Sequence, residues 1–354
     1  MPIQSQEARG IYKSMLVETF AERLKPTGFL RSFFPEKIVN SKYIDVEVQR
    51  GTEKIAVDVE RGSEGNRNKI SKLSQKKYES LYYREYFEAT DMDIYDVALN
   101  QSANDANVFS DFVEQSTDKL MACKDKIDRA YELLCANTLL HGIITTSSGD
   151  NIDFKRLSTS KVNLSASMID SNKYWTASDS NPFKTFKAAG DFLRTKGKYS
   201  GGTINVVMGS QAFSTFLSNA EVQTRGDIRR HLLEAIAAPQ RNAEGGAYHG
   251  TISEGSWNFN LWTYPQYYDT ETTTNNAYIP ENKVVFLPES PRFNFTYATV
   301  PSLIANGGIG RAQGSFVVGE FLDLRNTSHI FDIKSAGMPI PVAVDQIFTA
   351  QVEA

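Results

Sequence analysis

Residues 107–141, NVFSDFVEQSTDKLMACKDKIDRAYELLCANTLLH, decide the architecture of this chain because their apolar residues recur with the period of an α-helix. One stripe along this helix would contain Phe109, Phe112, Val113, Leu120, Ile127, Tyr131, Leu134 and Thr138. The other faces would carry Asp111, Glu114, Asp118, Asp125, Lys126, Arg129 and Glu132. Gly142 supplies a stop signal at the C-terminal end.

A single helix over this stretch would be long for a chain of this size. It would span about 52 Å, whereas a compact globule built from the whole chain would have a radius of gyration of about 20 Å. A break near Ser116 is the alternative. We expect one continuous helix and therefore an elongated subunit.

Residues 38–90 have the pattern of an extended ribbon. Polar and apolar residues alternate in 43–48 and 55–60, as in strands with one buried face. Between 61 and 74 apolar residues almost vanish and turn-forming residues dominate. Aromatic residues then return at Tyr78, Tyr82, Tyr83, Tyr86 and Phe87. This pattern predicts a projecting β-hairpin with a polar tip and an aromatic base.

The first 34 residues form an arm that ends in the aromatic block Phe29-Leu30-Arg31-Ser32-Phe33-Phe34, which Pro35 stops. Burying each phenylalanine is worth about 1.5–3 kcal/mol, so the block will not stay in water. It packs either on the core of its own chain or on a neighbouring molecule, and the sequence leaves both possibilities open.

A second unit begins at Asn181-Pro182, a helix cap followed by proline at the first helical position. A strand over 203–208 then leads through Gly209-Ser210 into another helix, and further strands are expected at 259–264 and 284–287. The tail, residues 319–354, is again strand-like. Helices interleaved with strands in this way indicate an α/β or α+β fold.

Charge is segregated along the chain. Residues 61–77 hold six basic residues and one acid, and residues 91–118 hold seven acids and no lysine or arginine. The basic residues are Arg61, Arg67, Lys69, Lys72, Lys76 and Lys77, and the acids are Asp91, Asp93, Asp96, Asp105, Asp111, Glu114 and Asp118. Opposite charges of this kind can attract between copies of the chain. A solvated loop or a contact with nucleic acid would also explain the basic segment.

Overall composition excludes several classes of protein. The chain has 354 residues and a formal charge of −4, which disfavours a protein whose main task is to grip DNA phosphates. It contains no apolar run of the roughly 18 residues that span a bilayer, and its polar start predicts no signal peptide. Cys123 and Cys135 lie twelve residues apart in the expected helix, too far for a disulfide. Free thiols indicate a reducing compartment, the cytoplasm.

Motifs for catalysis, metals or cofactors are not found. The four histidines, His141, His231, His249 and His329, are scattered rather than spaced as metal ligands. The glycine-rich stretch 307–314 has neither dinucleotide nor P-loop spacing, so we interpret it as a loop between strands. We therefore predict no enzyme activity, no cofactor and no metal.

These elements, in this order, resemble the major capsid proteins of tailed bacteriophages with the HK97 fold, and most closely the branch typified by the phage lambda major capsid protein. The block Phe29-Leu30-Arg31-Ser32-Phe33-Phe34 is its most specific part, and the hairpin, the long helix and the 203–217 strand–turn–helix follow in the family's order. The resemblance implies an α+β fold made of an N-terminal arm (1–36), an extended hairpin loop (37–92), a peripheral domain with a long spine helix (93–180), an axial domain (181–318) and a C-terminal return to the peripheral domain (319–354).

The resemblance also implies a function. The chain would be the major head protein, assembling in the host cytoplasm into hexamers and pentamers of an icosahedral shell that encloses double-stranded phage DNA. The alternative is an encapsulin-like shell of a cellular compartment. The implied partners are further copies of the chain, a scaffolding protein, a portal and a decoration protein, without membrane contact or sequence-specific DNA binding.

Residues that contact neighbouring subunits are expected in the aromatic block, in the basic segment and on the acidic part of the helix. The candidates are Phe29, Arg31, Phe33, Phe34, Arg67, Lys69, Lys72, Lys76, Lys77, Asp111, Glu114 and Asp118.

Overall fold

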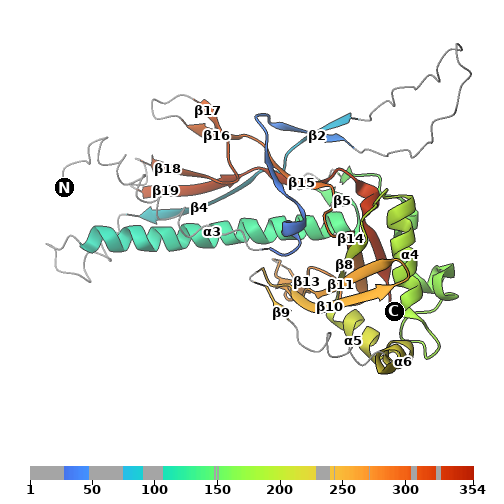
Figure 1. Cartoon of the computed structure of the whole chain (residues 1–354). Helices are drawn as coiled ribbons and strands as arrows, with labels where there is room; N and C mark the ends of the chain where they lie inside the picture. The colour runs from blue at the N-terminus through green and yellow to red at the C-terminus, as the bar shows by residue number, and fades with distance from the viewer. Residues whose placement is uncertain are drawn as a thin grey trace, which may run out of the picture.

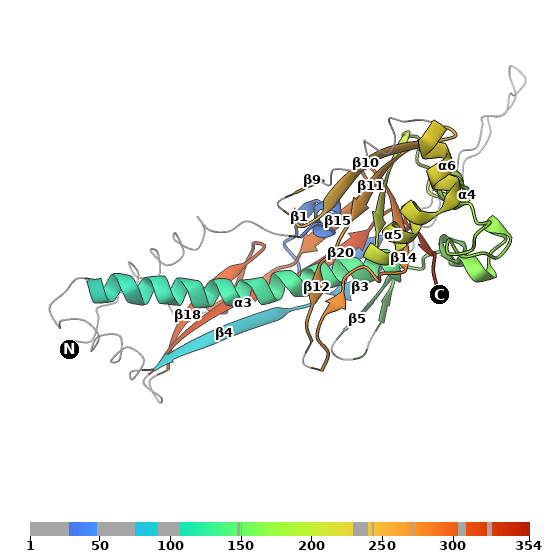
Figure 2. The ribbon, with the colours of Figure 1, turned by 90° about the horizontal axis from the view of Figure 1, so that it is seen from below.

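A long helix, a narrow sheet beside it and a broader lobe at one end make up the computed structural model (Figures 1 and 2). The structure describes residues 28–47, 75–90, 107–146, 149, 151–228, 240–242, 244–270, 272–303, 309–323 and 328–354. In these residues no helix is both long enough and apolar enough to cross a membrane.

The long helix, α3 (Asn107–Leu140), is continuous, so the prediction of one helix without a break near Ser116 is confirmed. On its predicted apolar stripe Leu120, Ile127, Tyr131, Leu134 and Thr138 are buried. Gly142, at φ +68°, ends the helix by donating its N–H to Thr138 O at 3.0 Å. Glu132, which the sequence places outside the apolar stripe, is nevertheless only 3% exposed.

A narrow antiparallel sheet runs along α3. Its strand order is β18 (Val317–Asp323), β19 (Ser328–Ser335) and β4 (Tyr83–Thr90). Alternate residues of β4 face the helix: the Tyr83 ring meets Tyr131 edge-on at 5.3 Å, and Phe87 stacks on Phe331 at 5.2 Å. The aromatic return from Tyr83 onward is thus a strand, but it pairs with the C-terminal part of the chain rather than with the first arm of the hairpin.

The base of the predicted ribbon is confirmed. β2 (Tyr43–Glu47) pairs antiparallel with β3 (Gln75–Glu79), and Tyr43 lies opposite Glu79. An exposed ion pair of 2.7 Å joins Lys42 to Glu79 at this base. The predicted strand over 55–60 and the turn-rich tip lie outside the described residues.

The lobe is built on a seven-stranded mixed sheet. Its strands, in spatial order, are β7 (Lys161–Asn163), β21 (Phe348–Gln351), β14 (Lys283–Pro288), β8 (Thr203–Met208), β11 (Trp257–Thr263), β10 (Ala247–Glu254) and β9 (Gln240–Arg241). The three strands predicted in this region are therefore confirmed as β8, β11 and β14. The last strand, β21, joins this sheet and not the narrow one that takes β18 and β19. Its buried Phe348 packs against Phe192 of the helix over 182–195 and against Phe286 of β14.

Helices α4 (Pro182–Thr195), α5 (Ser210–Ser218) and α6 (Ala220–Ile228) pack around this sheet (Figure 1). Asn181 Oδ1 accepts the Phe183 N–H at 3.0 Å, which confirms the predicted cap of α4. Gly190 in α4 allows a close approach, since a Cβ there would lie 2.6 Å from Trp257 Cδ1. Gly209 leads from β8 into α5, so the predicted strand–turn–helix is confirmed.

Short elements connect the two parts. A three-stranded sheet combines β1 (Glu36–Ile38), β15 (Phe293–Tyr297) and β20 (Gly337–Pro341), with β1 parallel to β15. The two-stranded pairs are β5 (Ile143–Thr145) with β6 (Asn151–Asp153), β12 (Tyr267–Tyr268) with β13 (Asn276–Ala277), and β16 (Val300–Leu303) with β17 (Ile309–Ala312). The 3-10 turns are η1 (Arg31–Phe33), η2 (Ser158–Ser160), η3 (Leu164–Ala166), η4 (Met168–Asp170) and η5 (Val344–Gln346).

One of these pairs corrects a prediction. The glycine-rich stretch 307–314, interpreted above as a loop, contributes strand β17, and Ile309 lies opposite Leu303 of β16. Glycine is permissive rather than strand-breaking where a partner strand supplies the hydrogen bonds.

Candidate assembly site

The aromatic block of the arm folds as a turn on the middle of α3. Phe29 packs against Trp262 and Tyr264 at ring distances of 5.1 and 5.5 Å, and Phe34 stacks on Phe293 at 5.0 Å. Phe29, Leu30 and Phe34 are buried in this way, whereas Phe33 is half-buried. The sequence left open whether the block packs on its own chain or on a neighbouring molecule. The buried residues of the block belong to the core of their own chain.

Arg31 is the centre of a buried polar cluster beneath this turn. Its Nη1 pairs with Asp128 Oδ1 and its Nη2 with Glu36 Oε1, each at 2.8 Å, and Nη2 also donates to the Tyr297 hydroxyl. The guanidinium lies 5.1 Å from the centre of the Phe295 ring. Lys124 completes the cluster with an ion pair of 2.5 Å to Asp128 Oδ2. Burial lowers the pKa of Arg31, but Tyr297, Asp128 and Glu36 outweigh it, so the net pKa is raised and the charge is secure.

Glu132 holds the backbone of the same turn. Its Oε1 accepts the Leu30 N–H at 2.7 Å, and its Oε2 accepts the Arg31 N–H at 3.1 Å. A hydrogen bond from Tyr264 adds a contact to the lobe. Gly28 is needed for this approach, because a Cβ there would lie 2.5 Å from Glu132 Oε2. One carboxylate therefore joins the arm, the long helix and the lobe.

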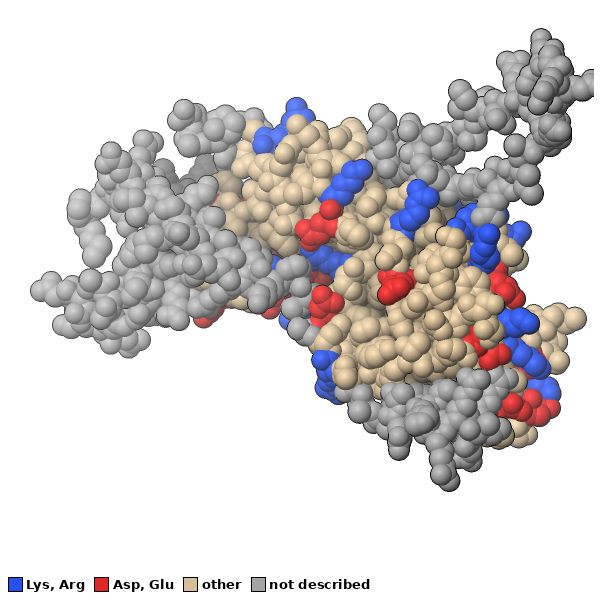
Figure 3. Space-filling view, viewed as in Figure 1, with Lys and Arg blue, Asp and Glu red and all other residues tan. Residues whose placement is uncertain are grey.

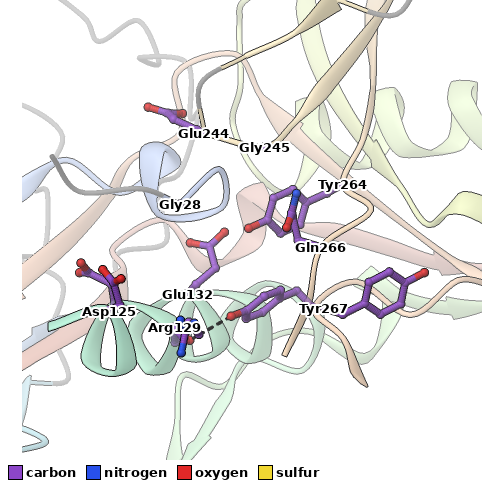
Figure 4. A pocket seen from close by; sticks show the side chains of 11 residues that line it. Gly28, Asp125, Arg129, Glu132, Glu244, Gly245, Tyr264, Gln266 and Tyr267 are labelled. Atoms are coloured by element: carbon purple, nitrogen blue, oxygen red, sulfur yellow. Dashed lines mark hydrogen bonds between the residues drawn. The ribbon is translucent and has the colours of Figure 1, made fainter. Parts of the chain in front are cut away.

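A cavity of about 330 Å³ opens beside the arm turn (Figure 4). Its walls come from α3, the arm turn and the chain on either side of the β10–β11 pair. Four carboxyl groups line it, Asp125, Asp128, Glu132 and Glu244. The Tyr278 hydroxyl donates to Arg129 O at 3.5 Å, the dashed contact in Figure 4. Glu132 thus lies in the wall of an acidic cavity.

Glu132 makes stability depend on pH. Burial raises its pKa above the ordinary value of 4.5, against the N–H and hydroxyl donors that lower it. Between these two pKa values the folded chain binds more protons than the unfolded chain, so the free energy of unfolding falls as pH rises. The slope from one proton is at most about 1.4 kcal/mol per pH unit.

We expect Glu132→Gln to remove this slope, measured by urea denaturation on both sides of the window. The exposed Glu221 provides the matched control, Glu221→Gln, which should keep it. An unchanged slope in Glu132→Gln would show that another group causes the dependence.

The predicted charged residues lie on separate parts of the chain. Lys76 and Lys77 are on β3 at the ribbon base, whereas Asp111, Glu114 and the exposed Asp118 are on the N-terminal part of α3 (Figures 1 and 2). Arg67, Lys69 and Lys72 lie outside the described residues. In the view of Figure 3, the described basic and acidic residues are interspersed, without a broad basic face.

Sequence reasoning missed the buried charged residues. Lys124, Asp128 and Glu132 follow one another at intervals of four on α3, a spacing that places them on one face of the helix. This face lies against Arg31 and the arm turn. The regular spacing, together with an arginine inside an aromatic block, was the signal that could have found the cluster.

The described histidines do not come together. His249 Nε2 hydrogen-bonds with Thr263 Oγ1 at 2.8 Å, and His329 Nδ1 lies 3.7 Å from Glu320 Oε1 in the narrow sheet. His141 is exposed at the end of α3, and His231 is outside the described residues. Within the described ranges, no three histidine, cysteine, aspartate or glutamate side chains are grouped so that they could hold a metal ion.

Two solved structures share this architecture over nearly the whole chain. A protein described as a prophage capsid protein of E. coli CFT073 is 13% identical, with a TM-score of 0.64 over 96% of this chain and 98% of that chain. A phage-related protein from Bordetella bronchiseptica RB50 is 13% identical, with a TM-score of 0.50 over 96% of each chain. A comparison with curated proteins gives no match. The fold is HK97-like and of the α+β class.

The sequence itself gives the family. A family profile described as phage major capsid protein E matches residues 16–352, so this chain belongs to the phage major capsid protein E family. It is a structural protein of the phage head, and its copies assemble into the capsid shell of the virion. The predicted resemblance is confirmed, and the cellular-compartment alternative is not favoured.

Proposed function

We propose that the chain assembles into hexamers and pentamers that close an icosahedral shell around double-stranded phage DNA. The observation that carries this proposal is the family match over residues 16–352, on a chain whose fold is elongated along α3. Assembly takes place in the host cytoplasm, with scaffolding, portal and decoration proteins as partners. The net negative charge of the chain, −4, is consistent with a shell that encloses DNA without binding its phosphates tightly.

The parts of the chain have distinct roles in this proposal. Residues 1–36 are the arm, 37–92 the extended loop, and 93–180 the peripheral domain around α3. Residues 181–318 form the axial domain, whose loops meet at the symmetry axes, and the tail from residue 319 returns to the peripheral domain through β18 and β19 before β21 joins the sheet of the lobe. The β2–β3 pair supports the extended-loop role, because it is separate from the seven-stranded sheet and from the narrow sheet along α3 (Figure 1).

The basic segment of the extended loop contacts the acidic part of α3 in a neighbouring subunit. Its proposed contact residues are Arg67, Lys69, Lys72, Lys76 and Lys77, opposite Asp111, Glu114 and Asp118. Within one chain β3 lies toward the C-terminal half of α3, away from these acids, which supports a contact between copies (Figures 1 and 2). The aromatic block offers a neighbour little more than Phe33, because Phe29, Arg31 and Phe34 are buried in their own chain.

Reversing Lys69, Lys72, Lys76 and Lys77 to glutamate should lower the yield of closed particles at least about tenfold, since repulsion then replaces an array of attractions. Particle yield is measured by sedimentation and negative-stain microscopy. Arginine at the same four positions keeps the charge and should assemble normally. Wild-type yield from the glutamate variant would refute the contact.

The proposed function has its own test. The chain is expressed alone and together with its neighbouring genes, and the products are examined by negative-stain microscopy. Closed particles of uniform diameter are expected. A monomer that stays dispersed at high concentration in the presence of its assembly factors would contradict the proposal.

A further inference from the structure

The outer face of β4 presents an oriented arginine. Because Tyr83, Glu85 and Phe87 face α3, Arg84 and Tyr86 lie on the opposite face of the strand. Arg84 Nε donates to Asp332 Oδ2 at 2.7 Å, and the guanidinium carbon lies 5.8 Å from the centre of the Phe321 ring. The side chain is nevertheless 46% exposed. Among the described residues, Asp332 is the hydrogen-bond partner of Arg84 through Nε, and these residues leave its two Nη groups unpaired.

The support beneath Arg84 is built into the sheet. Asp332, on the central strand β19, is completely buried, and its Oδ2 also pairs with Lys334 Nζ at 3.1 Å. Lys334 packs on the same Phe321 ring at 4.9 Å. Gly319 on β18 leaves room for this carboxylate, because a Cβ there would collide with Asp332 Oδ1. A buried acid therefore sets the orientation of a partly exposed guanidinium.

Two exposed tyrosines surround Arg84. Tyr86 is 60% exposed and Tyr82 is 46% exposed, and these two residues flank Arg84 on the outer side of the strand. Tyrosine and arginine are enriched among the residues that carry binding energy. In addition, β4 is an edge strand, so a neighbouring segment can lie alongside it.

We propose that this surface, the Arg84 patch (Tyr82, Arg84 and Tyr86), binds carboxylate groups of the acid-rich segment 91–118 of a second copy of this chain. A guanidinium held at Nε presents its remaining N–H donors as a fork, which matches a carboxylate in two-point geometry. Segment 91–118 offers seven carboxyl groups and no competing lysine or arginine. This inference rests on the proposed assembly into a shell and gives the acidic segment a second partner besides the basic loop.

The first test compares particle yields from Arg84→Glu, Arg84→Lys and Tyr86→Ser. Arg84→Glu should lower the yield at least about tenfold. Arg84→Lys should fall between it and wild type, because lysine keeps the charge but lacks the fork. Tyr86 is mostly exposed, so Tyr86→Ser should leave the thermal unfolding of the unassembled subunit unchanged and still reduce the yield. Lys196→Glu makes the same charge change at the exposed end of α4 and should assemble normally.

The second test identifies the occupant by charge exchange. Reversing Asp91, Asp93 and Asp96 to lysine should impair assembly alone and restore particles when combined with Arg84→Glu. Absence of restoration, or a wild-type yield from Arg84→Glu, would overturn the inference. Normal particles that retain less DNA would overturn it in favour of a phosphate contact. If wild-type chains form no closed particles, the proposed function fails first, so the two failures are distinguishable.

Discussion

Replacing Arg31 by methionine is expected to lower the free energy of unfolding by about 3–5 kcal/mol, the usual cost of removing one partner from a buried ion pair. The substitution leaves Asp128, only 4% exposed, with Lys124 as its remaining cation, and it removes the donor to Glu36 and Tyr297. The arm turn would then be held mainly by Glu132 and by its aromatic contacts. We therefore also expect the turn to separate from α3 before the rest of the molecule unfolds.

Urea denaturation of unassembled subunits measures the loss, and hydrogen exchange at the Leu30 and Arg31 amides reports the local release. Lys42 is the matched control, since its ion pair with Glu79 is about 60% exposed on both sides. Lys42→Met should therefore cost far less than Arg31→Met, because an exposed ion pair contributes little to stability. An equally small loss from Arg31→Met would mean that the buried cluster does not anchor the arm.

Replacing Arg156 by methionine is expected to cost at least about 3 kcal/mol, because several buried acceptors would lose a charged donor at once. Arg156 Nη1 donates to Leu139 O at 2.6 Å and to Leu140 O at 3.0 Å, which are carbonyls at the C-terminal end of α3. Its other donors reach Ser160 O, Ser160 Oγ, Ile347 O and Thr349 Oγ1. Burial among these acceptors lowers the pKa of Arg156 to about 9. One side chain therefore closes the helix end and joins it to β21.

The measurement is urea denaturation together with the helical circular dichroism signal. Arg156→Lys should recover part of the loss, because lysine keeps a charge but has three donors instead of five. Arg241→Met changes an exposed arginine on β9 and should stay within about 0.5 kcal/mol of wild type. A comparable value for Arg156→Met would show that water replaces the guanidinium without penalty.

Helices and strands with a clear periodic pattern were predicted well from the sequence. The long helix, its stop at Gly142, the cap at Asn181 and strand β8 depend on residues close together in the chain, so local rules were sufficient. The family resemblance is confirmed by the profile match over residues 16–352.

Long-range pairing was not predicted. β4 pairs with β19, and Phe87 lies opposite Phe331. The alternation of polar and apolar residues along β4 predicts a strand but does not predict which strand pairs with it. Likewise, the burial of Glu132 was not predicted, because a charged residue is seldom fully buried without partners. Its partners are backbone N–H groups of Leu30 and Arg31, far away in sequence.

By itself, the sequence determined the helix over 107–141, the second unit that begins at Asn181 and the likeness to phage capsid proteins, since these depend on periodicity and short motifs. Only the tertiary structure decided that the aromatic block packs on its own chain, that Arg31 and Glu132 lock the arm to the helix, and that Arg84 is held outward. Each of these outcomes depends on a contact between a buried charged side chain and a residue far away in the sequence. The cost of burying an unpaired charge selects that arrangement only when the whole chain is folded.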